Sequence, residues 1–358
     1  MTTLLYVTPH PAYGATLPTR PGALLDALVA SRAFDTTVVV NRVRPSAFVR
    51  TRLGHDSRPT LPGVRVVEHA WPFGPRERRF LTRLAHSLPA PVIAWVADPK
   101  STLFLADLGP TATGVVDAYD AWDISPLVVG ERRRNAVRDG YRAAARYARI
   151  VFANTELMAD RLRALGAADV RRLPNAAPVP DPIAPDPEPS LVYVGRVHER
   201  FSCELVAAAA ERLPAVTFRI IGPVERTPEG WSALLDRPNV RHEGALDAVA
   251  ARAAIGRSRG LLIPHTVDDY TRSQDAMKAW DAISVGAPVL ATPIPPVDRW
   301  PPGLALVATG PAEFAAAAER IVAGELDASR TDRLAFAAAN GWAQRAAEIL
   351  GAIREVAP

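Results

Sequence analysis

Cysteine and lysine are nearly missing from this 358-residue chain, and each scarcity excludes a class of protein. Because Cys203 is the single cysteine, a disulfide framework, a thiolate metal site and a paired-cysteine redox motif are excluded. We expect Cys203 to be a small core residue. Of the 42 basic residues 40 are arginines, and the two lysines are Lys100 and Lys278. The context of each lysine therefore carries information.

Long apolar runs and dense charge are missing as well. No stretch approaches the roughly 18 apolar residues that cross a bilayer, and no cationic segment precedes an apolar one at the N-terminus. We therefore expect a cytoplasmic protein without a signal peptide. The formal net charge is only +4, and the run at residues 132–134 is expected to be a solvated helix face. Because the arginines are scattered and few aromatic residues lie between them, nucleic-acid binding is not expected.

Two nucleotide-binding motifs are absent. Neither G-x-G-x-x-G nor G-x-x-x-x-G-K-[ST] occurs, which excludes a typical dinucleotide fingerprint and a P-loop. H-E-x-x-H and paired Cys/His spacings are missing too, and no D-x-D follows an expected strand. We therefore expect no bound metal and no resident cofactor.

Short β-branched runs alternate with helical stretches rich in Ala, Arg and Leu, a pattern typical of parallel α/β layers. The expected strands are residues 4–8, 37–41, 64–68, 92–96, 114–117, 150–153, 191–194, 217–221, 240–243, 260–264 and 288–291. The expected helices are residues 21–30, 131–147, 155–165, 203–212, 247–256, 275–284, 313–323 and about 332–356. The fold class is therefore α/β.

A proline-rich stretch divides the chain. Residues 174–189 contain seven prolines, so they can form neither a helix nor a central strand, and we interpret them as a linker. The expected domains are 1–173, 190–330 and a C-terminal helical segment, 331–358, that packs back on the first domain. This organisation predicts two Rossmann-like domains facing across a cleft, with ligands at the carboxyl ends of the strands.

The segment 260–292, GLLIPHTVDDYTRSQDAMKAWDAISVGAPVLAT, has the most informative pattern. An expected strand leads through a polar loop into a helix, whose first backbone N–H groups and dipole attract a diphosphate. Arg272 and Lys278 flank the expected helix start. Asp281 lies three residues after Lys278 on the same face, where a carboxylate can accept hydrogen bonds from ribose hydroxyls. A solvated ion pair between these two residues is the alternative.

This segment, together with LVYVGRV (191–197), FRIIGP (218–223) and NVRHEGAL (239–246), resembles GT-B-fold, nucleotide-sugar-dependent glycosyltransferases of the broad bacterial family 1/4-like kind. The first half carries weaker similarity in LPTRPGALLDALV, GVVDAYDAW, YARIVFANTELM and PNA. In the strongest segment five positions match the family pattern in order: Thr271, Lys278, Asp281, Gly286 and Pro288.

The resemblance implies a role for each of these positions. Arg196, Arg272 and Lys278 would bind the donor diphosphate, with Thr271 in the same loop, and Asp281 would bind the ribose. The backbone of residues 244–246, beginning at Gly244, would contact the base. His265 is a candidate contact of the donor sugar or phosphate, and an ordinary loop histidine is the alternative. A UDP-sugar is the favoured donor.

One position departs from the family. Many retaining relatives carry a glutamate at the position that Ser273 occupies, with seven residues between it and the ribose acid, and the second carboxylate here is Asp281 rather than the commoner Glu. Retention of configuration therefore cannot be inherited from the resemblance, and both stereochemical outcomes stay open.

An inverting enzyme needs a general base beside the acceptor hydroxyl. Asp120, which follows an expected strand, is the first candidate, and Asp117 and His10 are alternatives. Trp122 is a candidate sugar platform and Arg20 a candidate contact for an acidic acceptor. Each has a structural alternative: a turn or cap for Asp120 and His10, and a surface ion pair for Arg20.

The sequence thus predicts a hexosyltransferase-type enzyme that moves a sugar from a nucleoside diphosphate donor to an acceptor hydroxyl without metal. The acceptor is a small molecule or a lipid-linked one, bound by the first domain. Two alternatives remain: a nucleotide-sugar 2-epimerase on the same fold, and a non-catalytic nucleotide-sugar-binding partner protein.

Overall fold

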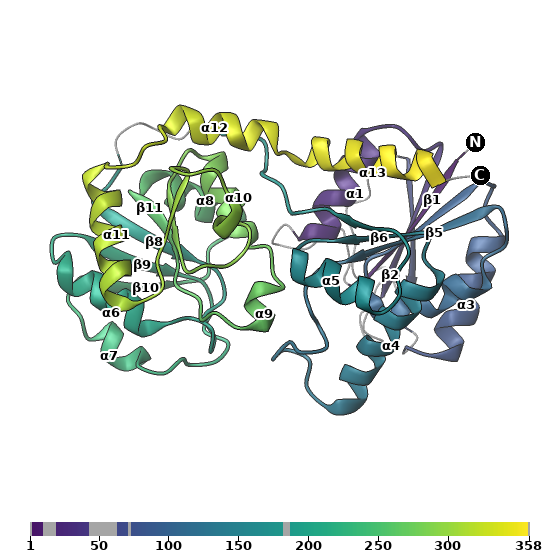
Figure 1. Ribbon diagram of the computed structural model, residues 1–358, viewed down its shortest axis with the longest axis horizontal. Helices are drawn as coiled ribbons and strands as arrows, with labels where there is room; N and C mark the ends of the chain where they lie inside the picture. Colours follow the sequence, from purple (N-terminus) through teal and green to yellow (C-terminus); the bar gives the residue numbers. More distant parts are fainter. Residues whose placement is uncertain (1, 10–18, 43–62, 71–72, 182–186, 357–358) are drawn as a thin grey trace, which may run out of the picture. The chain divides into compact units, whose positions relative to one another are not determined.

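The computed structural model describes residues 2–9, 19–42, 63–70, 73–181 and 187–356 (Figure 1). It divides into two compact units. Unit 1 consists of Met1–Pro174 and Ala343–Pro358, and unit 2 of Asn175–Trp342. The boundary of unit 1 lies within one residue of the expected one, but residues 331–342 belong to unit 2 and not to the C-terminal segment.

Unit 1 is built on a seven-stranded parallel sheet in the order β3-β2-β1-β4-β5-β6-β7. Its strands are β1 (Thr3–Thr8), β2 (Thr36–Arg42), β3 (Val64–His69), β4 (Val92–Val96), β5 (Ala112–Ala118), β6 (Ile150–Ala153) and β7 (Val170–Arg172). The flanking helices are α1 (Arg20–Ala30), α3 (Pro75–His86), the 3₁₀ segment η1 (Pro99–Asp107), α4 (Glu131–Tyr147), α5 (Glu156–Ala164) and α13 (Trp342–Val356).

Unit 2 has a six-stranded parallel sheet in the order β10-β9-β8-β11-β12-β13. Its strands are β8 (Ser190–Val194), β9 (Thr217–Ile221), β10 (Val240–Gly244), β11 (Gly260–Ile263), β12 (Val289–Ala291) and β13 (Ala305–Val307). The helices are α6 (Cys203–Arg212), α7 (Trp231–Leu235), α8 (Ala248–Arg257), α9 (Asp269–Arg272), α10 (Met277–Ser284), α11 (Pro311–Ala323) and α12 (Arg330–Ala339), with the 3₁₀ turn η2 (Val297–Arg299).

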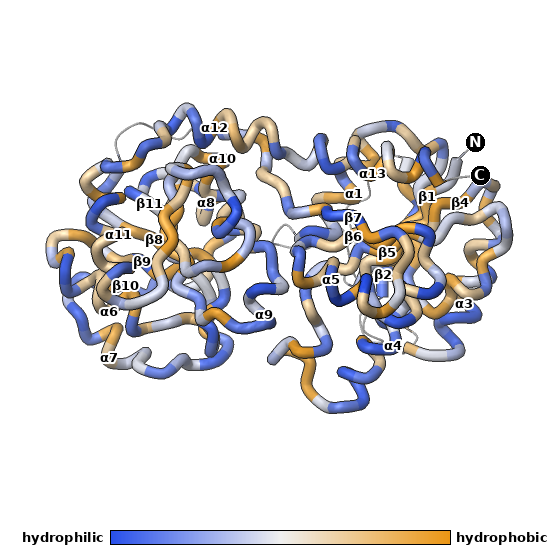
Figure 2. Tube along the Cα trace, viewed as in Figure 1, coloured by the Kyte–Doolittle hydropathy of each residue, from blue (hydrophilic) through white to orange (hydrophobic). Residues whose placement is uncertain are grey.

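The central strands of both sheets are buried on their two faces, which explains why they are continuous apolar runs rather than alternating ones. Every residue of β4 and β11 is buried, and the hydropathy of the trace is highest along the strands of each unit (Figure 2). In unit 2, α6 and α11 pack together and their apolar residues join one core cluster, to which Phe314 contributes a fully buried ring.

The structure confirms the α/β class and most of the expected elements, and it corrects three points. The expected helix 332–356 is two helices, α12 and α13, separated at Asn340 and Gly341, where Gly341 forms a parallel bridge with Ala177. Two short edge strands, β7 and β13, were not expected. The helix α3 was also missed, because its composition is dominated by charged residues and its apolar face is narrow.

Candidate functional site

Three glycines end neighbouring strands at the carboxyl edge of the sheet in unit 2. Gly195 follows β8, Gly222 follows β9, and Gly244 ends β10, with φ angles of 139°, 142° and 69°. The amide of Gly195 donates to Ile221 O at 2.8 Å, and that of Gly222 donates to Gly244 O at 2.6 Å. A Cβ on Gly222 would lie 2.0 Å from the Gly195 carbonyl oxygen. Glycine is therefore required for the close approach of these strand ends.

Lys278 extends from the start of α10 into this edge. Its ammonium lies 4.1 Å from the centre of the Tyr193 ring and 3.5 Å from Nε2 of His265. A Cβ on Gly195 would stand 2.6 Å from the Lys278 Nζ atom. Burial lowers the pKa of Lys278 well below its ordinary value, and the nearby Arg200 lowers it further. Among the described residues no carboxylate lies within ion-pair distance of this lysine, although Asp281 of the same helix attracts its proton, so the two do not form the solvated ion pair of the alternative interpretation.

His265 follows β11 and is only 3% exposed. Its carbonyl accepts a hydrogen bond from Thr292 Oγ1 at 2.7 Å, and its ring meets the Tyr193 ring edge-on at 6.0 Å. Burial and the positive charge of Lys278 hold the pKa of His265 well below the ordinary histidine value. The structure therefore brings His265 and Lys278 together, as the prediction of a shared site requires.

Two further basic residues of this site were missed by the sequence analysis. Arg200 donates to Gln274 Oε1, and its buried Nε has no hydrogen-bond partner. The ring of His198 is buried, and burial together with Arg200 lowers its pKa to about 4. Neither residue is distinctive in the sequence. Arg200 is one of 40 arginines, so nothing selects it until its neighbours in the fold are known.

Asp281 lies one turn after Lys278 on α10. Burial raises the pKa of its carboxyl group to about 6, although the positive charges of Arg252 and Lys278 act in the opposite direction. The helix begins at Met277, two residues later than expected, because the Asp275 carboxylate accepts a hydrogen bond from Trp280 Nε1 at 2.7 Å and precedes the first helical residue.

The loop between β11 and α10 places three predicted residues differently. Thr271 is buried, and its hydroxyl completes a capping box with Asp268 and donates to Thr266 O at 2.8 Å. The structure thus gives Thr271 a structural task, and its contact with the donor stays a prediction. Arg272 is exposed at the end of α9. Ser273 is fully buried, and its hydroxyl donates to Tyr270 O at 2.6 Å.

The remaining predicted donor residues lie at the glycine-lined edge. Arg196 follows Gly195, is largely exposed, and pairs with Glu225 at 3.2 Å. Its carbonyl accepts a hydrogen bond from the Tyr193 hydroxyl at 2.9 Å, which fixes the loop backbone. No atom lies within 4 Å of a Cβ built on Gly244, so its backbone borders open space.

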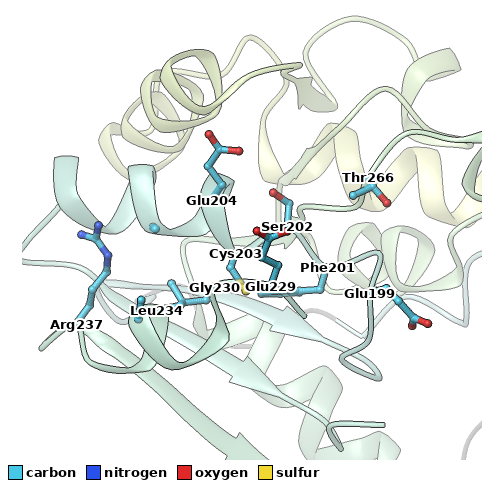
Figure 3. A pocket seen from close by; sticks show the side chains of 12 residues that line it. Glu199, Phe201, Ser202, Cys203, Glu204, Glu229, Gly230, Leu234, Arg237 and Thr266 are labelled. Carbon is cyan, nitrogen blue, oxygen red and sulfur yellow. The ribbon is translucent and has the colours of Figure 1, made fainter. Parts of the chain in front are cut away.

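A cavity of about 500 Å³ is lined by residues of α6 and α7 and by the loops that contain Phe201 and Thr266 (Figure 3). Three carboxylates reach its rim from Glu199, Glu204 and Glu229. Arg237 lines the cavity as well, so its charged residues are of both signs, unlike the cluster around Lys278. Cys203 lies on its wall, and burial raises the pKa of the thiol to about 11, which makes it unreactive.

A G-x-S-x-G sequence spans residues 256–260, a spacing found in the nucleophile elbows of hydrolases. In such elbows the serine follows a strand and precedes a helix. Here Ser258 follows α8 and precedes β11, and its buried hydroxyl bonds to Ile255 O at 2.8 Å and Gly260 O at 3.2 Å. The order of elements is reversed, so this serine is structural.

In unit 1, Asp120 occupies a strained position after β5. Its φ of +57° is uncommon for a residue with a side chain. Asn154 Nδ2 donates to the Asp120 carboxylate at 3.0 Å, and the Tyr141 hydroxyl donates to the Asp120 carbonyl at 2.7 Å. The carboxylate is half-buried and held in one orientation, as a positioned base requires.

Arg20 and Asp117 form a buried ion pair within unit 1. The guanidinium donates to Asp117 Oδ1 at 2.7 Å and to Leu173 O at 2.8 Å, and the two side chains are 3% and 0% exposed. Arg20 therefore holds α1 and the segment after β7 against β5, which corrects its predicted role as an acceptor contact. Asp117, the alternative base, is neutralised in this pair.

The other two predicted residues of unit 1 contribute less. Trp122 is half-buried, packs against the core and meets Tyr119 edge-on at 5.9 Å. His10 lies outside the described residues. Within the described ranges no three His, Cys, Asp or Glu side chains are grouped as metal ligands. No helix in the same ranges has the length and apolarity needed to span a membrane.

Comparison with solved structures establishes the fold. HepE from Anabaena, solved in complex with UDP, is 14% identical with a TM-score of 0.71, over 99% of this chain and 100% of that one. Sucrose-phosphate synthase from Thermosynechococcus elongatus is 15% identical with a TM-score of 0.76, over 99% of both chains. The lipopolysaccharide outer core galactosyltransferase WaaB is 14% identical with a TM-score of 0.68, over 99% of both chains.

Sequence comparison gives one match, in the second half of the chain. No curated protein sequence matches the chain significantly. The family model described as glycosyl transferase-like matches residues 198–351, which include Arg200, His265, Lys278 and Asp281. The chain therefore has the GT-B fold, and its residues 198–351 match a glycosyl transferase-like domain, in agreement with the resemblance seen in its sequence.

Proposed function

We propose that this protein transfers a sugar from a UDP-sugar to an acceptor hydroxyl, with the donor bound by unit 2. Lys278 and Arg200 would neutralise the diphosphate, and the backbone after β8 and β10 would contact the phosphates and the base. Asp281 would accept hydrogen bonds from the ribose. The UDP in the solved HepE structure supports this choice of nucleoside diphosphate.

One observation carries the proposal: basic side chains gather at the carboxyl edge of a parallel sheet, and among the described residues no carboxylate lies within ion-pair distance of Lys278. The Lys278 ammonium lies against the Tyr193 ring and His265, with Asp281 one turn further along the same helix. Among the described residues the Nε of Arg200 has no partner. Buried charge without a counter-charge is costly, so a fold that retains it gains from an anionic ligand. Negative charge develops on a departing diphosphate, and these cations would stabilise it without a metal.

Unit 1 would bind the acceptor, with Asp120 as the general base of an inverting reaction. The positive φ of Asp120 and its hydrogen bond from Asn154 support this role. Removing a positioned base typically costs about 10²–10⁴ in rate. We therefore expect Asp120→Asn to abolish most transfer while leaving UDP affinity unchanged. Transfer at the wild-type rate by that variant would overturn the assignment.

The donor site is tested by titrating UDP into the wild type, Lys278→Ala and Lys100→Ala, the last removing the other lysine of the chain. Wild type and Lys100→Ala should bind UDP equally, and Lys278→Ala should lose about 100-fold in affinity. If UDP does not bind the wild type, the proposed function is wrong. Turnover in EDTA tests metal independence, and incubation with UDP-sugar alone tests the 2-epimerase alternative.

A further inference from the structure

The pair formed by His265 and Lys278 has an arrangement that cation binding alone does not require. The His265 backbone is fixed by a bridge to Phe201 and by a hydrogen bond from Thr292, and its ring packs edge-on against the Tyr193 ring. The Lys278 stem is confined between Gly195 and the Tyr193 ring. With both side chains held, Nζ and Nε2 stand 3.5 Å apart. A neutral imidazole accepts through Nε2 when its proton is on Nδ1.

Two basic groups this close cannot both be charged at low cost, because the second positive charge is repelled by the first. The charges around them increase that repulsion. From the loop after β8, Arg200 acts on both groups and His198 acts on His265. On α10 itself, the Asp281 carboxylate favours the charged form of the lysine. Arg252 of α8 also interacts with this carboxylate, and its positive charge lowers the pKa of Asp281. Tyr193 of β8 stays neutral, since burial raises its pKa to about 12.

We propose that His265 and Lys278 share one proton in the free protein and take up a second when a nucleoside diphosphate binds. His265 thereby becomes a second cation of the diphosphate site. This inference rests on the proposed function. The binding step is balanced: the protein with one proton on the pair, the diphosphate and one proton from solvent give the complex with both groups charged.

The physical reason for uptake is that the ligand reverses the local field. A diphosphate carries several negative charges, which favour the charged form of each neighbouring base. By linkage, a group that binds protons more tightly in the complex makes ligand binding consume protons. Weaker binding at high pH follows, since the second proton must then be taken from a more dilute supply.

The test is calorimetric titration of UDP into the full chain at pH 8, in buffers of different ionisation enthalpy such as HEPES and Tris. At this pH the terminal phosphate, with a second pKa of about 6, is already ionised and contributes little. The observed enthalpy should vary with the buffer enthalpy, with a slope of about half a proton or more per UDP. His265→Gln should still bind UDP, with a slope near zero. His69→Gln, at a buried histidine of unit 1, is the matched control and should keep the wild-type slope.

The outcomes separate the two proposals. If wild-type UDP binding shows no buffer dependence, the shared proton is refuted and the proposed donor site stands. If His265→Gln keeps the wild-type slope, the proton goes to another group and the inference is overturned. If UDP does not bind the wild type, both fall. Should the variant not fold, ¹⁵N shifts of the wild-type His265 ring must change from neutral to charged on UDP addition, and an unchanged ring refutes the proposal.

Discussion

The two sheets differ in whether the cations at their carboxyl edges have carboxylate partners. In unit 1, Arg20 forms an ion pair with Asp117 at 2.7 Å, and Lys100 lies 3.5 Å from Asp98. Arg42 bonds to Asp98 at 2.8 Å and to Glu77. In unit 2, Lys278 meets an aromatic ring and a neutral histidine, with no carboxylate at ion-pair distance in the described residues.

This difference separates cations that hold the fold from those for which we propose a ligand. A buried ion pair is satisfied, and removing one partner leaves the other charge uncompensated. A buried cation without a partner is a cost to the fold that an anion can relieve. The two lysines illustrate both cases, since Lys100 lies beside Asp98 whereas Lys278 does not have such a neighbour.

Breaking the closed pair in unit 1 should give the largest effect. Arg20→Met leaves the Asp117 carboxylate buried and unpaired, so we expect a loss of about 3–5 kcal/mol in unfolding free energy. Hydrogen exchange should locate this loss in unit 1, with UDP affinity retained. Unchanged protection of β5 in the variant would mean that the pair is not essential to the fold.

Replacing the glycine beneath Lys278 should weaken ligand binding rather than the fold. In Gly195→Ala, the new Cβ stands 2.6 Å from Nζ at a φ of 139°, so the lysine must move. We expect about a tenfold loss of UDP affinity, or about 1.4 kcal/mol. Gly74→Ala is the matched control, because Gly74 has a φ of 132° and open space around its Cβ position. An equal loss of affinity in both variants would contradict the role of Lys278.

The buried carboxylate of unit 2 should have a pH-dependent cost. The pKa of Asp281 is raised to about 6 in the fold, against about 3.9 in the unfolded chain. Its contribution to stability is therefore fully present below pH 4 and lost as the pH rises through 6. Asp281→Asn should raise stability by about 2 kcal/mol at pH 8 and leave it unchanged below pH 4. Thermal denaturation at both pH values tests the sign.

The two lysines should give the smallest effects, of opposite sign. Lys278→Met removes a buried cation without a counter-charge, so the ligand-free protein should gain about 1 kcal/mol. Lys100→Met removes the ammonium beside Asp98, so it should lose about 0.5 kcal/mol. Denaturant titration of both variants measures the difference. A loss of stability in Lys278→Met would show that a counter-charge stabilises Lys278 in the ligand-free protein.

Most of the fold was accessible from sequence because its strands are short buried runs between helices. The strand expected at residues 92–96 and the helices expected at 131–147 and 203–212 have the observed bounds. Edge strands such as β13, three residues long and partly exposed, lack such a pattern. The break between α12 and α13 was missed because the apolar spacing continues across Asn340 and Gly341.

The sequence also selected Lys278, Asp281 and His265 as site candidates, because scarcity and spacing mark them in one segment, and the structure places Lys278 beside His265. It did not distinguish Thr271, whose hydroxyl serves a capping box, or Arg20, whose charge is consumed by Asp117 97 positions away. The sequence did not indicate Arg200, because the feature that marks it, a buried Nε without a hydrogen-bond partner among the described residues, can be seen only in the fold.

By itself, the sequence determined the α/β class, the proline-rich boundary and the segment that carries the lysine and the aspartate. Periodicity and residue scarcity are local properties, so they can be recognised without the fold. Only the tertiary structure decided which charged side chains have an ion-pair partner and which do not. Charge pairing depends on distances between segments far apart in the chain, and in this arginine-rich protein those distances distinguish structural cations from candidate ligand-binding ones.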